Sequence, residues 1–225
     1  MSLAGILSQI TVQAPRPLPV LLLIDVSGSM AEDGKLAALN TALRDMVQAF
    51  GEERTGGAEI QVTVLTFGGR EARVHLPLQP ARDVRYEVME AAGHTPLGSV
   101  LALATRILED RTLIPGRAYR PTVILVSDGV PTDDWEEPLE ALLGAPRASK
   151  ALRLALAVGE DADLDVLTRF AGDGQVRQAH EARQLRRFFR FVTMSVTARS
   201  RSATPDQPVT LPDLGEDDGF DDLDA

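Results

Sequence analysis

The chain has 225 residues, a formal net charge of −10 and no cysteine. This length accommodates one α/β domain with a full core, and the lack of cysteine excludes disulfides, thiolate zinc sites and thiol catalysis. The three histidines are scattered, so a histidine-based zinc site is not expected. No apolar run reaches the ~18 residues of a transmembrane helix, and the first residues lack the pattern of a signal peptide. We therefore expect a cytoplasmic location and no membrane span.

Negative charge is concentrated after Arg201, where the chain has eight acidic residues and neither lysine nor arginine. We expect an N-terminal arm at residues 1–16, a folded domain at residues 17–197 and an acidic tail at residues 198–225. From about Thr204 onward the composition favours disorder. The folded part contains one basic cluster, consisting of Arg183, Arg186, Arg187 and Arg190. Without a larger basic patch, nucleic-acid binding is not expected.

Strand and helix patterns alternate along the folded part. Apolar runs predict strands at Leu18–Asp25, Glu59–Phe67, Arg73–Pro80, Thr122–Ser127 and Leu152–Val158. Apolar residues at helical spacing predict helices at Lys35–Phe50 (ended by Gly51), Pro96–Leu108, Trp135–Leu143, Leu164–Phe170 and Arg183–Val196. Prolines in residues 73–80 place that strand at an edge. The alternation is typical of a doubly wound α/β fold, with a mostly parallel sheet between two layers of helices.

Three turns carry oxygen-bearing side chains beside these elements. Residues 25–29 (DVSGS) end the first strand, residues 93–96 (GHTP) precede a helix, and residues 127–129 (SDG) end another strand. In an open α/β sheet, ligands bind at the carboxyl ends of the strands, where such turns can converge. Oxygen ligands suit a hard divalent cation such as Mg²⁺. The sequence therefore predicts a metal site at this edge.

The DVSGS turn, followed by Thr95 and Asp128, resembles the metal-ion-dependent adhesion site (MIDAS) of von Willebrand factor A (VWA) domains. The resemblance covers about residues 17–197 and implies a Rossmann-like VWA fold with one antiparallel edge strand. It implies that the metal ligands are Asp25, Ser27, Ser29, Thr95 and Asp128. The three hydroxyls would bind the metal directly, and the two carboxylates partly through water.

Mg²⁺ takes about six oxygens, so this ligand set leaves about one position for an Asp or Glu of a partner protein. Mn²⁺ and Ca²⁺ are alternative ions. We expect Gly28 to let the turn approach the metal, and a side chain at that position to clash.

Residues 28–40 and 94–101 further resemble the bacterial tellurite-resistance (TerY-like) branch of the family. This implies a stress-response system whose partners are a PP2C-type phosphatase and a Ser/Thr-type kinase. We expect a non-enzymatic, metal-dependent scaffold for other proteins. One alternative is a Mg²⁺-dependent hydrolase or phosphotransferase, although the sequence has neither a P-loop nor a G-x-S-x-G motif. Another is an adaptor of a MoxR-type AAA+ ATPase.

Several residues near the site or in the tail have two interpretations. The acidic residues Asp33, Asp133 and Asp134 either rim the metal or are solvated, and Trp135 either anchors an interface or belongs to the core. The arginine cluster either faces water or receives the tail or an acidic partner. The tail either solubilises the chain or docks through Phe220 and Leu223 among its aspartates.

Overall fold

The computed structural model describes residues 15–53, 57–172 and 175–207. Most of the expected arm at residues 1–16 and of the expected tail at residues 198–225 lies outside these ranges. Among the described helices, none is long and apolar enough to cross a membrane.

One six-stranded sheet forms the centre of the molecule, in the order β3-β2-β1-β4-β5-β6. Its strands are β1 (Arg16–Asp25), β2 (Ala58–Gly68), β3 (Glu71–Pro80), β4 (Thr122–Ser127), β5 (Leu152–Val158) and β6 (Val176–Ala179). β3 pairs antiparallel with β2, whereas the other neighbouring pairs are parallel. The predicted mostly parallel sheet with one antiparallel edge strand is confirmed.

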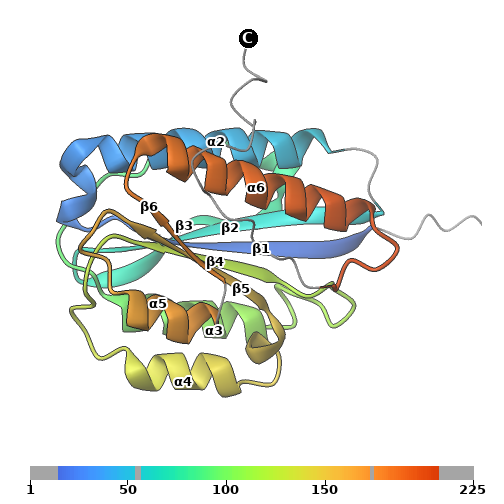
Figure 1. The fold of residues 1–225 in the computed structure, drawn as a ribbon. Helices are drawn as coiled ribbons and strands as arrows, with labels where there is room; N and C mark the ends of the chain where they lie inside the picture. The colour runs from blue at the N-terminus through green and yellow to red at the C-terminus, as the bar shows by residue number, and fades with distance from the viewer. Residues whose placement is uncertain (1–14, 54–56, 173–174, 208–225) are drawn as a thin grey trace, which may run out of the picture.

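Helices cover both faces of the sheet (Figure 1). They are α2 (Lys35–Glu52), α3 (Leu97–Glu109), α4 (Glu136–Gly144), α5 (Leu164–Ala171) and α6 (Ala182–Arg201), with short 3-10 turns η1 (Gly28–Gly34), η2 (Ala81–Asp83) and η3 (Ala148–Lys150). α2 and α6 pack on one face, and α3, α4 and α5 on the other. This two-sided cover confirms the doubly wound arrangement.

The apolar run of β1 supplies both cores, because successive side chains of a strand point to opposite faces. One core, with α2 and α6, includes Leu18, Val20, Leu22 and Ile24. The other core, with the remaining helices, includes Leu21 and Leu23. Burying one leucine contributes about 2 kcal/mol, so β1 is a central anchor of the sheet. It also pairs with β4 in register, Ile24 opposite Val126, which brings the carboxyl ends of the two strands together.

Several predicted ends shift by one or two residues, and three differences bear on the fold. β6 was not predicted, because its four residues mix polar and apolar side chains and give no periodic signal. α2 does not end at Gly51 but continues to Glu52. A Cβ on Gly51 would lie 3.2 Å from the Ala81 carbonyl oxygen, so this glycine fits close packing against η2 rather than a helix cap. α6 continues past the predicted end at Val196 to Arg201.

Candidate metal centre

The three predicted turns meet at the carboxyl edge of the sheet. The Gly28 amide donates to the Gly93 carbonyl at 3.0 Å, which ties the turn after β1 to the segment before α3. The Thr95 amide donates to Thr132 Oγ1 at 3.1 Å, and the Thr132 amide donates to the Thr95 carbonyl at 3.0 Å. These bonds tie the segment before α3 to the loop after β4. The convergence expected from the fold is therefore held by specific bonds between the loops.

Asp25 is fully buried at the end of β1. Its Oδ1 accepts a hydrogen bond from the Ser27 amide at 2.8 Å, and its Oδ2 accepts one from Ser127 Oγ at 2.6 Å. Burial raises the pKa of Asp25 by more than these hydrogen bonds lower it. A nearby cation would offset the cost of the buried negative charge, so the local electrostatics favour cation binding.

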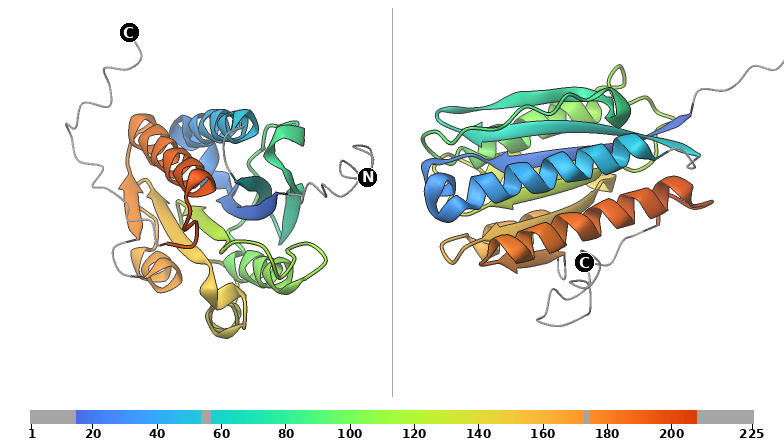
Figure 2. Two further views of the ribbon diagram at one scale, coloured as in Figure 1. Left: turned by 90° about the vertical axis from the view of Figure 1, so that its right-hand side faces the viewer. Right: turned by 90° about the horizontal axis from the view of Figure 1, so that it is seen from above.

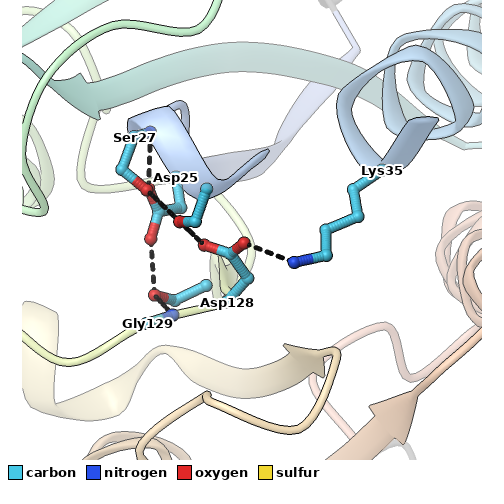
Figure 3. A network of polar contacts seen from close by, with 7 residues as sticks. Asp25, Ser27, Lys35, Asp128 and Gly129 are labelled. Atoms are coloured by element: carbon cyan, nitrogen blue, oxygen red, sulfur yellow. Dashed lines mark hydrogen bonds and ion pairs between the residues drawn. The ribbon is translucent and has the colours of Figure 1, made fainter. Parts of the chain in front are cut away.

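Asp128 is the centre of a second set of contacts (Figure 3). Its Oδ1 accepts from Ser29 Oγ at 2.7 Å and from Ser27 Oγ at 3.5 Å, and the two serine hydroxyls lie 3.1 Å apart. Its Oδ2 pairs with Lys35 Nζ at 2.9 Å. The side chain of Asp128 is fully buried, so the lysine ammonium is the positive charge that compensates it in this structure.

Sequence reasoning missed Lys35. Its side chain is 18% exposed and reaches from the first residue of α2 to Asp128. Although desolvation opposes its charge, the hydrogen bond and the charge of Asp128 raise the pKa of Lys35. The chain has only two lysines, Lys35 and Lys150, and one lies ten residues after Asp25. A buried aspartate needs a compensating charge, and that requirement could have directed attention to this lysine.

Thr95 is buried beside the same loop. A Cβ on Gly129 would lie 3.7 Å from Thr95 Oγ1, so the hydroxyl faces the residue that follows Asp128. Capping of α3 is the task of Asp133, whose two carboxylate oxygens accept from the amides of Gly98 and Ser99, each at 2.9 Å. Neither interpretation of Asp133 offered above was correct, because its side chain is fixed at a helix start.

The rim of the site is exposed at Gly28, Gly93 and His94, and the Val130 side chain is 62% exposed. Trp135 packs partly buried against the core, with the guanidinium carbon of Arg169 4.6 Å from the centre of its ring. The core interpretation of this tryptophan is therefore the better one. The loops around the candidate metal centre are therefore open to solvent at these positions.

The side chains present fit a small, hard cation. Within the described residues, no group of three or more His, Cys, Asp or Glu side chains is arranged to hold a metal, so a site here depends on hydroxyl oxygens. In an octahedral Mg²⁺ site, bond lengths of 2.0–2.1 Å place neighbouring oxygens about 2.9 Å apart. The 3.1 Å between the Ser27 and Ser29 hydroxyls is close to this spacing. Neutral hydroxyls would leave the ion electrophilic toward a further ligand.

The expected clash at Gly28 is not found among the protein atoms. A Cβ at this position would lie 3.6 Å from the Gly93 carbonyl oxygen, which is an ordinary contact. The backbone here does not require glycine by steric exclusion, so that prediction was wrong.

Comparison with known proteins agrees with this architecture. Residues 20–130 match the sequence model of the von Willebrand factor type A domain. The uncharacterized protein Rv2850c of Mycobacterium tuberculosis is 32% identical over 113 residues, which is 49% of this chain and 17% of that protein.

Two solved structures share the fold at low identity. The von Willebrand factor type A protein of Catenulispora acidiphila is 23% identical, with a TM-score of 0.60 over 80% of this chain and 42% of its own. Proximal thread matrix protein 1 of the mussel byssus, whose MIDAS motif is occupied by zinc, is 14% identical, with a TM-score of 0.59 over 82% of this chain and 48% of its own. The chain thus spans less than half of each of these relatives. Residues 20–130 are therefore similar in sequence to the von Willebrand factor type A domain, and the described part of the chain shares the fold of these two structures.

Proposed function

We propose that the chain is a metal-dependent protein-interaction module. The hydroxyls of Ser27, Ser29 and Thr95 would hold a divalent cation directly, with Asp25 and Asp128 acting partly through water. A bound cation would supply an electrophilic position for a carboxylate of a partner protein. The observation that supports this proposal is the hydrogen-bonded cluster of Ser27, Ser29 and the buried Asp128, with the buried Asp25 bonded to the Ser27 amide. The Thr95 hydroxyl lies beside the residue after Asp128, and the neighbouring loops are exposed.

Mg²⁺ is the ion we propose, with Mn²⁺ or Ca²⁺ as alternatives, because the side-chain donors are all oxygens. We place the interaction domain at about residues 17–197, with the N-terminal arm before it and the acidic tail after it. The proposed setting is the cytoplasm.

The finer part of the proposal rests on the resemblance of residues 28–40 and 94–101 to the tellurite-resistance branch. It assigns the module to a bacterial stress-response or signalling system, with a PP2C-type phosphatase and a Ser/Thr-type kinase as partners. An adaptor for a MoxR-type ATPase is the alternative, and co-purified proteins would separate the two.

The metal site is tested by titrating Mg²⁺ and Mn²⁺ into the wild type and Ser29→Ala in a calorimeter. We expect at least a tenfold loss of affinity, about 1.4 kcal/mol, because the substitution removes one donor. Ser149→Ala, beyond the site in η3, is the matched control and should bind metal like the wild type. Equal affinity in all three proteins contradicts the proposed ligand set.

The bridge to a partner is tested separately by affinity purification from the source cell, with and without EDTA. Capture should depend on metal and be lost in Asp25→Ala. Capture that is unaffected by both treatments excludes a metal bridge. Turnover of phosphoesters by the purified protein in Mg²⁺, with loss in Ser27→Ala, would instead support the hydrolase alternative.

A further inference from the structure

A groove of about 450 Å³ runs between α2 and α6, on the sheet face opposite α3, α4 and α5. Figure 2 shows the two helices side by side across this face. The residues that line it include Ala42, Met46 and Phe189, which are buried and which we call the apolar floor, and Met194. Met194 is 51% exposed, which is high for a large apolar side chain. The groove therefore presents apolar surface to solvent away from the candidate metal centre.

One wall of the groove is strongly basic. Four arginines of α6 line it, and we call them the arginine stripe: Arg183, Arg186, Arg187 and Arg190. Their spacing of i, i+3, i+4 and i+7 puts them on one face of the helix. Asp45, on α2, is the acidic residue among those lining the groove. A ligand that fits must therefore combine negative charge with apolar side chains.

The segment from residue 208 to residue 225 has this composition. It contains no lysine or arginine, and its acidic residues are Asp213, Glu216, Asp217, Asp218, Asp221, Asp222 and Asp224. Phe220 and Leu223 lie among them. Residues 1–14, the other long segment outside the described ranges, contain no acidic residue and cannot complement the arginine stripe.

The segment is also long enough to reach the groove. The described chain stops at Gln207, just after α6, where Asp206 Oδ1 accepts from the Arg120 amide at 2.7 Å. The arginine stripe lies 11 to 18 residues back along α6 from Arg201, which corresponds to about 16–27 Å at 1.5 Å per residue. An extended chain covers about 3.3 Å per residue. Asp213, six residues past Gln207, can reach about 20 Å, and residues 216–224, nine or more residues past it, can reach about 30 Å or more. The acidic residues from Glu216 onward can therefore reach the whole length of the stripe.

We propose that the groove between α2 and α6 binds the acidic segment of the same chain, residues 208–225. The aspartates pair with the arginine stripe, and Phe220 and Leu223 cover the apolar floor. The inference is independent of the proposed metal function, because no residue of the candidate metal centre takes part.

The chain has no cysteine, so a single nitroxide can be attached at Ala225→Cys in the full chain. Paramagnetic broadening of backbone amide signals is then measured in EDTA at low salt. We expect loss of signal intensity at α2 and α6 along the groove, and little loss on the face formed by α3, α4 and α5. At 1 M NaCl the Debye length falls to about 3 Å, so the intensities at the groove should recover.

Charge reversal by Arg183→Glu with Arg186→Glu should abolish the broadening at the groove. Both positions are exposed in the first turns of α6, where acidic side chains suit the helix dipole, so the fold should persist. Arg106→Glu with Arg111→Glu makes the same change in net charge at exposed positions in and just after α3, and should leave the broadening intact. Phe220→Ala with Leu223→Ala should weaken the broadening at the groove, because the variant lacks the two side chains proposed to pack on the apolar floor.

Two results would overturn the proposal. Broadening that is equal on both faces, or that survives the reversal of Arg183 and Arg186, shows that the segment does not use the groove. Broadening that appears when isotope-labelled chain without nitroxide is mixed with unlabelled chain carrying it shows that the segment of a second copy is the occupant.

Discussion

The two ends of β4 each bury a charge, and they do so in different ways. At its start, the Arg199 guanidinium donates to Thr122 Oγ1 at 2.5 Å, to the Arg120 carbonyl at 2.8 Å and to the Pro205 carbonyl at 2.6 Å. At its other end, the carboxylate of Asp128 is held by side-chain hydroxyls and the ammonium of Lys35. Two partners of the arginine are backbone carbonyls fixed by the fold, whereas those of the aspartate are side chains that can rotate away.

This difference separates the charge of Arg199, which the fold holds in place, from that of Asp128, to which we assign a role in the proposed metal centre. Burial lowers the pKa of Arg199 to about 10, so the guanidinium stays protonated at neutral pH and bonded to its acceptors. The hydroxyls around Asp128 can exchange one partner for another, and they lie next to exposed loops. Burial of charge alone therefore does not distinguish the two ends; replaceable partners with access to solvent favour the Asp128 end as the candidate binding site.

The largest effect is expected at the structural end. Arg199→Met leaves two buried acceptors and one partly buried acceptor without their donor, which should lower the free energy of unfolding by about 3 kcal/mol. Urea denaturation measures this loss, which should be the same in Mg²⁺ and in EDTA because the candidate metal centre is at the other end of the strand. Arg106→Met, an exposed control on α3, should change stability by less than about 0.5 kcal/mol. If the loss of stability in Arg199→Met differs between Mg²⁺ and EDTA, the two ends of β4 are energetically coupled and the distinction between them is wrong.

At the functional end, removing a charge should stabilise the metal-free protein. Burial raises the pKa of Asp25, so the carboxyl group binds its proton more tightly in the native state than in the unfolded state. The wild type therefore gains stability as the pH falls through this pKa and loses it as the pH rises. In EDTA at pH 7, Asp25→Asn should be more stable than the wild type, and the difference should shrink on acidification.

Thermal unfolding over a pH series measures this difference, with Asp161→Asn as an exposed control that should follow the wild type. Mg²⁺ that binds only the native state stabilises it. Adding Mg²⁺ should therefore stabilise the wild type but not Asp25→Asn, which lacks one of the proposed ligand carboxylates. If Asp25→Asn is less stable than the wild type in EDTA at every pH, the buried charge at this end is structural like that of Arg199.

A smaller effect is expected at Lys35, whose ammonium occupies one oxygen of Asp128. Lys35→Met removes a positive charge that competes with a cation, so divalent metal should bind about fivefold more tightly, roughly 1 kcal/mol for a partly exposed pair. Calorimetric titration measures the dissociation constant, and Lys150→Met in η3 is the matched control. Unchanged or weaker binding would mean that the lysine orients Asp128 for the metal and does not compete with it.

Sequence reasoning was most successful where a pattern had one physical solution. The apolar runs of β1 and β4 can be buried only between two helix layers, and parallel strands bring their ends to one edge. The loops of Asp25, Thr95 and Asp128 were therefore expected to converge, and they do.

The sequence was least informative about contacts made by side chains from residues distant in the chain. Nothing local marks Ser127 as the donor to Asp25 Oδ2, or Asp133 as the cap of a helix that starts more than thirty residues earlier. Lys35 acts through the length and flexibility of its side chain, which sequence spacing does not encode. β6 was missed because a four-residue edge strand is defined by pairing with β5 and not by its own composition.

The smallest effect is expected at Gly28, and it sharpens the distinction between steric and chemical requirements within the metal centre. Gly28→Ala adds a methyl group 3.6 Å from the Gly93 carbonyl oxygen, so stability in EDTA should change by less than about 0.5 kcal/mol. Gly98→Ala is the informative contrast, because its Cβ would lie 2.1 Å from the Asp134 carbonyl oxygen and would force apart the loop that Asp133 holds on α3. If Gly28→Ala instead weakens metal binding while leaving stability unchanged, the methyl group obstructs the cation or its partner. Glycine at position 28 would then be required so that the cation or its partner can reach the site, and not for the fold of the turn.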